Sequence, residues 1–333
     1  RFDAVQVETL DYPDLTEYVK AHSYPVNQTY LDDEGWPLVD EKTQVLLEKI
    51  KAAGVPLGTY VQGKIYRGVL TGLNEAFVID EETRERLIAE DPRSAEVIKP
   101  FLAGRDVKRY APLETDTFLI LFEKGVSNRK GAGYRSKWTW LEDEYPAVAA
   151  YLKPFQKEAE KRYDKGDYWW ELRACDYYQE FEKPKIIYAE IATRGQFTID
   201  RDGHYSDTTS YIIGNSSPYL VGILNSTLWT FLFSNISSEI RGGFFRWKRQ
   251  YMWNLPIRPI DPANPADVAR HDRIVVLVEK MLDLNKRLAA AETPHEREVL
   301  AGMIDATDRE IDRLVYELYG LTEEEIAVVG GTR

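Results

Sequence analysis

Two apolar stripes near the C-terminal end constrain the fold of this chain most strongly. The first runs over residues 274–288 and follows a helix-start signal at residues 264–267, where Asn precedes Pro and then an acid. The second runs over residues 300–318, behind Thr, Pro and Glu at residues 293–296 that are typical of a helix start. Because both stripes are continuous and capped, they predict two antiparallel helices, with Leu314 buried against the partner helix.

The central part of the chain has a different pattern. Glycines separate the apolar residues of segment 65–79, which predicts a strand, a glycine turn and a second strand. Residues 218–233 have the apolar density of one buried helix. Further strands are predicted at residues 117–122, 185–191, 196–199 and 205–213. The expected fold class is therefore α+β, a mixed-sheet domain followed by the C-terminal antiparallel helical pair.

Length and pattern together predict three parts. The chain has 333 residues, which exceeds the usual range for one domain, and 44% hydrophobic residues, enough for a substantial core. We expect residues 1–60 to be a linker and docking segment, residues 61–260 the α+β domain, and residues 261–333 the helical region. The sequence opens at Arg1 without an initiator Met or a signal-like apolar segment, from which we expect a cytoplasmic protein and a fragment of a longer chain.

The net charge of −12 would ordinarily argue against a nucleic-acid partner, because phosphate binding requires Lys and Arg. The excess acid, however, lies at the two ends. Residues 1–60 carry 11 acids and 5 bases, and residues 261–333 carry 16 acids and 9 bases. Residues 61–260 are left with 28 acids and 29 bases, so the central part is not acidic.

Two windows in the central part contain no acid. The first basic window, residues 124–137, runs into Trp138 and Trp140. The second basic window, residues 241–249, contains or adjoins Phe244, Phe245, Trp247 and Tyr251. Cations suit phosphate and flat rings suit bases or sugars, so both windows are typical of a nucleic-acid surface. A solvated charged loop beside core aromatics explains either window alone equally well.

The sequence lacks recognisable catalytic and metal-binding motifs. Four scattered His residues and Cys175 supply no metal-ligand spacing, and residues 200–203 favour a hairpin turn over a calcium loop. Segment 125–131 lacks the spacing of a phosphate-binding loop and is predicted to be a mobile surface loop. The longest apolar stretch, residues 218–233, is shorter than the roughly 20 residues that span a bilayer. We therefore expect no catalytic residue, no metal site and no membrane association in this chain.

One segment, IYRGVLTGLNEAFVID at residues 65–80, resembles the specificity region of adenine-specific DNA methyltransferases of the TaqI-like and type IIG restriction-modification family. Further segments agree with this family in the same order: IKPFLAGRDVKRY at 98–110, YLKPFQKEAEKRYDKGDYWWELR at 151–173, KPKIIYAEI at 183–191, LVGILNSTLWTFLF at 220–233 and IDRLVYELYGLTEEEI at 311–326. Together they extend along nearly the whole chain, which makes the resemblance specific.

In that family the N-terminal half binds S-adenosylmethionine and methylates adenine through an Asn-Pro-Pro-Tyr type motif. This sequence has no such motif, and its nearest segment, residues 216–219, favours a helix start. The resemblance therefore implies a target-recognition part, with residues 61–260 as its DNA-recognition domain and residues 1–60 docking onto the N-terminal methyltransferase domain. The implied partners are double-stranded DNA and that domain. S-adenosylmethionine would bind in the catalytic half and not in this chain.

Candidate DNA contacts come from the two windows and from the matched segments. Those expected to contact phosphates or guanine edges are Arg129, Lys130, Arg135, Lys137, Arg246, Lys248 and Arg249. Asn128 and Gln250 are expected to read adenine, because amide side chains can pair with its edge. Arg67, Lys108 and Arg109 are second-rank candidates from the matched segments. The two windows are expected to line one DNA-facing cleft.

Two other classes of function stay open from the sequence. One is a stand-alone methyltransferase or nuclease with unrecognised motifs, which binding of S-adenosylmethionine would distinguish. The other is a protein-interaction adaptor of a phage-defence assembly that docks through its helical pair, and salt-dependent duplex binding would exclude it. The parent protein is compatible with a restriction nuclease further upstream.

We predict that this chain alone does not bind S-adenosylmethionine, because it has neither a glycine-rich strand-to-helix turn nor an Asn-Pro-Pro-Tyr motif. Calorimetric titration of the cofactor into the protein measures this directly. Micromolar binding with one-to-one stoichiometry would overturn the prediction and favour the stand-alone enzyme.

Overall fold

The computed structural model describes residues 1–331, apart from residue 6, residues 8–10 and residues 31–37. The chain divides into two compact units. The terminal unit comprises Arg1–Gly63, Ile191–Gly195 and Ser217–Arg333, and the central unit comprises Lys64–Glu190 and Gln196–Ser216. These units report packing and not function, so the three functional parts expected from the sequence remain a prediction.

Two four-stranded sheets form the centre of the central unit. The first has the order β10-β8-β12-β4 and is antiparallel throughout: β4 (Ile65–Arg67), β8 (Lys185–Ala189), β10 (Phe197–Asp200) and β12 (Ser210–Ile213). The second has the order β11-β6-β7-β5: β5 (Val78–Asp80), β6 (Ile98–Leu102), β7 (Thr117–Ile120) and β11 (Tyr205–Ser206). In the second sheet β11 pairs in parallel with β6 and the other pairs are antiparallel. The predicted mixed sheet is therefore confirmed.

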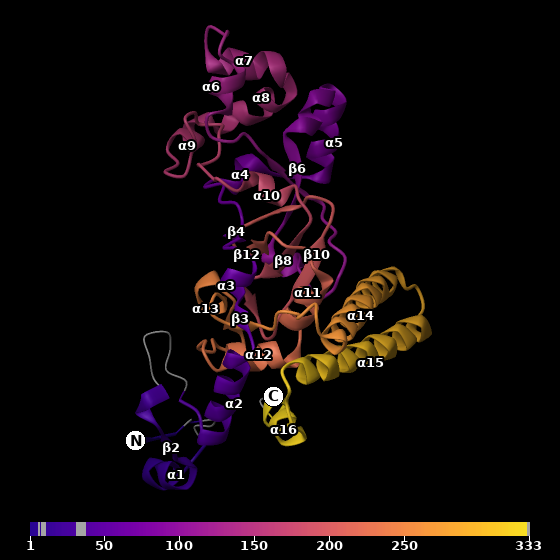
Figure 1. The fold of residues 1–333 in the computed structure, drawn as a ribbon. Helices are drawn as coiled ribbons and strands as arrows, with labels where there is room; N and C mark the ends of the chain where they lie inside the picture. Colours follow the sequence, from indigo (N-terminus) through magenta and orange to yellow (C-terminus); the bar gives the residue numbers. More distant parts are fainter. Residues whose placement is uncertain (6, 8–10, 31–37, 332–333) are drawn as a thin grey trace. The chain divides into compact units, whose positions relative to one another are not determined.

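Short helices complete the central unit (Figure 1). The α-helices are α4 (Asn74–Phe77), α5 (Glu81–Glu90), α6 (Val126–Lys130), α7 (Lys137–Glu144), α8 (Pro146–Leu152), α9 (Gln156–Glu160) and α10 (Tyr178–Phe181). Three 3-10 turns accompany them, η2 (Pro92–Glu96), η3 (Gly104–Asp106) and η4 (Lys153–Phe155). Helix α5 packs on β5, β7 and α8, and a core rich in aromatic side chains, including Phe77, Phe122 and Trp140, lies among these elements.

The terminal unit is mostly helical. Its helices are α1 (Leu15–His22), η1 (Gln28–Tyr30), α2 (Glu41–Ala52), α3 (Leu57–Tyr60), α11 (Pro218–Leu224), α12 (Thr227–Ser234), α13 (Arg249–Met252), α14 (Pro265–Ala290), α15 (Pro294–Leu318) and α16 (Glu323–Gly330). Three antiparallel strand pairs accompany them: β1 (Phe2–Ala4) with β2 (Tyr24–Val26), β3 (Val55–Pro56) with β14 (Pro256–Ile257), and β9 (Ile191–Ala192) with β13 (Phe245–Arg246). Within the described residues, every helix is too short or too polar to cross a bilayer.

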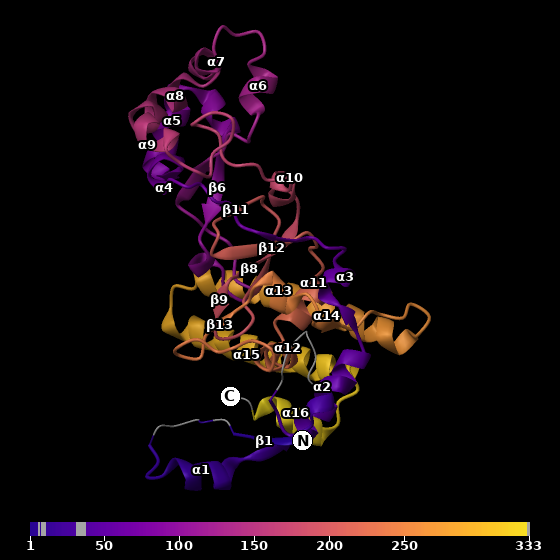
Figure 2. The ribbon, with the colours of Figure 1, turned by 90° about the vertical axis from the view of Figure 1, so that its left-hand side faces the viewer.

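The predicted C-terminal helical pair is confirmed, and with it the α+β class. Helices α14 and α15 lie side by side (Figures 1 and 2), and Leu314 on α15 is only 5% exposed. Helix α14 also packs on α11 at Gly222, where an added Cβ atom would lie 2.7 Å from Ile274 Cγ2. Glycine permits this approach, because an added methyl group would require the Ile274 side chain or one of the helices to shift.

Three local predictions were wrong. Phe77, expected in the second strand of segment 65–79, instead ends helix α4, and the strand begins one residue later at Val78. Residues 218–233 form two helices, since the hydroxyl of Ser226 accepts a hydrogen bond from Trp229 N (3.1 Å) and caps α12. Residues 126–130, expected in a mobile loop, form helix α6.

Helix α6 begins at a buried carboxylate from a distant part of the chain. Glu171 is 0% exposed, and its side chain accepts hydrogen bonds from Gly125 N (2.9 Å), Ser127 N (3.0 Å) and Asp167 N (2.8 Å). The neighbouring Trp170 donates from Nε1 to Ser127 Oγ at 2.9 Å. A carboxylate at the start of a helix satisfies amides that have no intrahelical partner. The first basic window is therefore held by residues that follow it by about 45 positions.

We predict that Leu314→Asp lowers the free energy of unfolding by about 3 kcal/mol, because it places an unpaired carboxylate at a buried position of α15. Denaturant unfolding of the pure protein measures the change. Met303→Asp is the matched control, since Met303 lies on the same helix and is 37% exposed. Equal denaturation midpoints for Leu314→Asp and the parent chain would contradict the burial of Leu314 on α15.

We also predict that Glu171→Gln destabilises the central unit by about 1–3 kcal/mol, because the new NH2 group must face at least one backbone N–H donor. Amide hydrogen exchange should rise at Gly125, Ser127 and Asp167. Glu123→Gln removes an equal charge from a partly exposed position and should leave both quantities unchanged. Unaltered exchange at all three amides would contradict the role given to Glu171.

Candidate nucleic-acid interface

The first basic window presents most of its cations to solvent. Arg129, Lys130 and Arg135 are exposed, and Lys137 is half-buried with Nζ donating to Gly131 O at 2.8 Å. Arg129 faces the carboxylate of Glu123 at 3.6 Å. Lys130 and Arg135 have no ion-pair or hydrogen-bond partner among the residues that the structure describes. These two side chains are thus the cations of this window that remain available to an anionic ligand.

Asn128, expected to read adenine, already has partners for its amide. Its Nδ2 donates to Asp167 Oδ2 at 3.0 Å, and its Oδ1 accepts from Tyr168 OH at 2.8 Å. Lys124 lies 3.7 Å from the other oxygen of Asp167. Reading adenine requires both ends of an amide, so Asn128 would have to exchange these two bonds for base contacts. The role remains a prediction, and in the free protein Asn128 connects α6 to the segment around Asp167.

The second basic window lies in the terminal unit. Arg246 ends β13, Arg249 begins α13, and both are exposed, as is Gln250, while Lys248 is half-buried. The guanidinium of Arg249 lies over the ring of Trp253 at 4.6 Å. Such cation–π contacts hold the side chain without neutralising it. The window therefore keeps its charge at the surface of its unit.

The aromatic residues next to the windows divide into core and surface. Trp140 and Trp247 are 2% and 1% exposed, so neither can stack on a base, contrary to the expectation for aromatics beside the windows. Trp247 stacks on Phe233 at 4.0 Å and donates from Nε1 to Ala192 O at 3.0 Å. Phe244 and Tyr251, by contrast, are exposed at 41% and 38%. The sequence alone does not distinguish the buried from the exposed aromatic residues, because Lys and Arg lie next to both kinds.

The second-rank candidates differ in their surroundings. Arg67 donates from Nε to Thr208 O at 2.9 Å and pairs with Glu190 at 3.3 Å. Lys108 is exposed, and the half-buried Arg109 lies over the ring of Tyr110. The structure assigns the first window and these three residues to the central unit and the second window to the terminal unit. One shared DNA-facing cleft therefore remains a prediction.

A pocket of about 220 Å³ lies beside the first window. Arg129, Lys130 and Lys99 line it together with acids, and Lys99 pairs with Glu182 at 3.0 Å. Burial and a hydrogen bond to Glu96 raise the pKa of the lining Tyr145 to about 12. The hydroxyl is therefore a hydrogen-bond donor at neutral pH. The mixture of acids and bases gives this pocket no preference for an anion.

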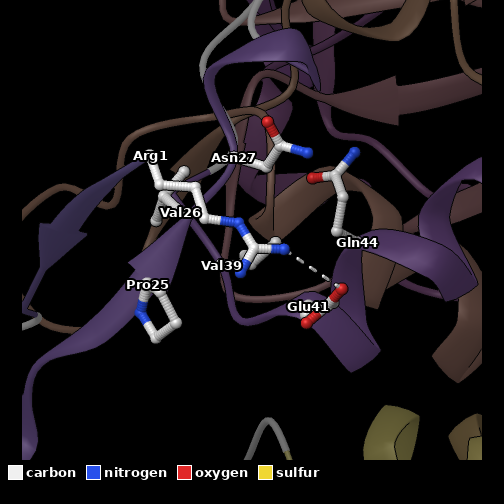
Figure 3. Close-up of a pocket in the computed structure, with 7 residues that line it drawn as sticks. All are labelled: Arg1, Pro25, Val26, Asn27, Val39, Glu41 and Gln44. Atoms are coloured by element: carbon white, nitrogen blue, oxygen red, sulfur yellow. Dashed lines mark ion pairs between the residues drawn. The ribbon is translucent and has the colours of Figure 1, made fainter.

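A smaller pocket in the terminal unit lies between the β1–β2 pair and α2. Figure 3 shows Arg1 facing Glu41, with 3.9 Å between the guanidinium and the carboxylate, and with Val26 and Gln44 completing the wall. Its volume of about 20 Å³ accommodates about one water molecule. It is too small for a cofactor or a nucleotide.

Asp200, Asp202 and His204 bring their ligand atoms within 4.8 Å of one another. The fully buried Asp200, however, already pairs with the buried ammonium of Lys185 and accepts hydrogen bonds from Asp202 N (2.9 Å) and His204 N (2.9 Å). Burial alone would raise the pKa of Asp200, but the bonds from His204 and Lys185 hold it below its usual value. Since Lys185 supplies the positive charge, this group fits the hairpin turn expected at residues 200–203 better than a metal site.

Cys175 is half-buried, and burial raises the pKa of its thiol. A thiol that stays protonated is a poor nucleophile. The structure therefore offers no argument for a reactive role of this residue.

Residues 99–257 match the family described as the TaqI-like C-terminal specificity domain. The fold is similar to that of the type IIL restriction-modification enzyme MmeI in complex with DNA, with a TM-score of 0.55 and 13% sequence identity over 81% of this chain and 35% of that one. The type IIG restriction endonuclease BpuSI gives a TM-score of 0.42 and 14% identity over 86% of this chain and 34% of that one. No curated protein sequence matches this chain.

This chain therefore spans about a third of the length of either enzyme. The family match begins within β6 and ends with β14, so it includes both basic windows and every candidate contact except Arg67. The resemblance seen in the sequence is confirmed as a resemblance: residues 99–257 match the TaqI-like C-terminal specificity domain.

Proposed function

We propose that this chain recognises a specific duplex DNA sequence on behalf of a site-specific adenine (N6) DNA methyltransferase of a restriction-modification system. The observation that carries the proposal is the match of residues 99–257 to a specificity domain. MmeI, whose fold is similar over 81% of this chain, was solved in complex with DNA, and the proposal extends DNA binding to this chain. Methylation and the S-adenosylmethionine site are assigned to a separate catalytic domain.

Base methylation explains why such a module is needed. An enzyme that modifies a base within a duplex must turn that base out of the stack, while other contacts hold and read the flanking DNA. Exposed cations hold the phosphates, and side chains at the base edges give specificity. A chain with exposed cations and no recognisable catalytic motif is suited to holding and reading the flanking DNA, while another domain modifies the base.

The surroundings of each cation suggest how the contacts are divided. Lys130 and Arg135 have no partner among the described residues, so binding a phosphate costs them no existing ion pair. Arg246 and Arg249 are exposed in the second window. We assign these four to phosphate contacts or guanine edges, and Gln250 to base reading. Arg129 and Arg67 would first have to leave Glu123 and Glu190.

We predict that Arg246→Glu together with Lys248→Glu weakens binding to every duplex in a randomised pool. Each phosphate contact that is lost should also reduce the slope of log affinity against log salt by about 0.9. Binding measured at two or more salt concentrations gives both quantities. Lys130→Glu with Arg135→Glu should behave in the same way for the first window.

Lys286→Glu with Arg309→Glu is the matched control, because both residues are exposed on the helical pair and the change in net charge is identical. If neither window's reversal differs from this control, the windows are ordinary solvated surface. A substitution that changes preference at only one position of the site would instead identify a base-reading residue, worth about 1–3 kcal/mol against the wrong base.

A further inference from the structure

A segment outside the two windows carries the most exposed large apolar side chain in the described part of the protein. Tyr163, in the loop of residues 161–168, is 98% exposed, whereas the other exposed large apolar residues reach only 57%. A single exposed apolar residue is ordinary on a protein surface. Tyr163 is unusual because hydrogen bonds and ion pairs fix the residues on both sides of it.

The residue directly before Tyr163 is a buried arginine. Arg162 is 6% exposed, and its guanidinium lies over the ring of Phe77 at 4.3 Å. Backbone carbonyl oxygens accept its hydrogen bonds: those of Thr71, Ala159, Asp164, Trp169 and Glu171. Burial lowers the pKa of Arg162 to about 10, so it remains charged at neutral pH. A buried guanidinium bonded on several sides fixes the backbone that passes it.

The residues after Tyr163 are fixed as well. Asp164 pairs with Arg173 at 3.3 Å. The ammonium of Lys165 donates to Arg162 O at 2.9 Å and to Glu160 O at 2.8 Å, the carbonyls just before Tyr163. Gly166 N donates to Glu171 O at 3.0 Å. The loop is thus held on both sides of a ring that is itself almost fully in solvent.

The same loop is joined to the first basic window. Asp167 accepts from Asn128 Nδ2 at 3.0 Å, and Tyr168 donates to Asn128 Oδ1 at 2.8 Å. The carboxylate of Glu171 bonds the amide of Asp167 and those of Gly125 and Ser127. The loop that carries Tyr163 is therefore hydrogen-bonded to helix α6, which carries the exposed cation Lys130.

From this arrangement we propose that Tyr163 is a DNA-contacting residue whose ring stacks on or inserts beside a base where the first window holds the backbone. The inference rests on the proposed function. Aromatic rings stack on bases whatever their identity, and apolar wedges enter duplexes at opened base steps. A ring carried on an already ordered loop loses little conformational entropy on binding, which favours this use.

The test compares Tyr163→Ala, Tyr163→Phe and the parent chain for binding to a randomised duplex pool at several salt concentrations. Tyr163→Ala should lower affinity about tenfold with an unchanged salt slope, because stacking releases no counterion. Tyr163→Phe should bind like the parent. The melting temperature of Tyr163→Ala should not change, since its ring is 98% exposed. Val276→Ala, which trims a side chain 57% exposed on α14, is the control and should have no effect on binding.

The outcomes separate the two proposals. If the parent chain binds duplex DNA with a salt slope and Tyr163→Ala binds equally well, the inference is wrong and the proposed function stands. If Tyr163→Phe weakens binding as much as Tyr163→Ala, or the salt slope of Tyr163→Ala falls, the contact is not a stacking ring and the inference is also overturned. Failure of the parent chain to bind any duplex overturns both.

Discussion

The buried carboxylate of Glu171 is the constraint on which the candidate interface depends. A carboxylate without access to water needs hydrogen-bond donors, and here both of its oxygens accept from backbone amides, two in the distant segment 125–127 and one at the nearby Asp167. The amides of Gly125 and Ser127 place the start of α6, and the amide of Asp167 places the next loop. The exposed side chains of these segments therefore extend from backbone that Glu171 holds in place.

The long amphipathic elements could be predicted from the sequence because their pattern repeats over many residues. Helices α14 and α15 are of this kind. The strands β8, β10 and β12 are short and fully buried, and they could be predicted because each is a short apolar run. The break between α11 and α12 depends instead on one hydroxyl: Ser226 accepts from Trp229 N and donates to Ile223 O at 2.7 Å. A Ser inside an apolar run is compatible with a continuous helix or with a cap, so periodicity cannot decide between them.

At the candidate site, the sequence predicts residue types but not their partners. The cations of the windows are visible as such, yet the pairing of Arg129 with Glu123 and of Asn128 with Asp167 depends on tertiary contacts. The role of Glu171 is equally hidden, because its bonds span 44 and 46 residues. The one available signal is a lone acid in the run of Trp169, Trp170 and Leu172, where an acid is buried only if it has partners.

The distribution of ion pairs also explains how a chain of net charge −12 can present a cationic surface. At physiological salt, exposed charges are screened beyond about 8 Å, so the acids at distant positions weigh little on a given phosphate contact. The acids that matter are those within an ion-pair distance, such as Glu123 beside Arg129 and Asp167 beside Lys124. If the window binds DNA as proposed, a count of its cations overstates the number of counterions that the duplex would lose on binding. Lys130, Arg135 and Lys137 have no such neighbour among the described residues, so these three cations set its effective charge.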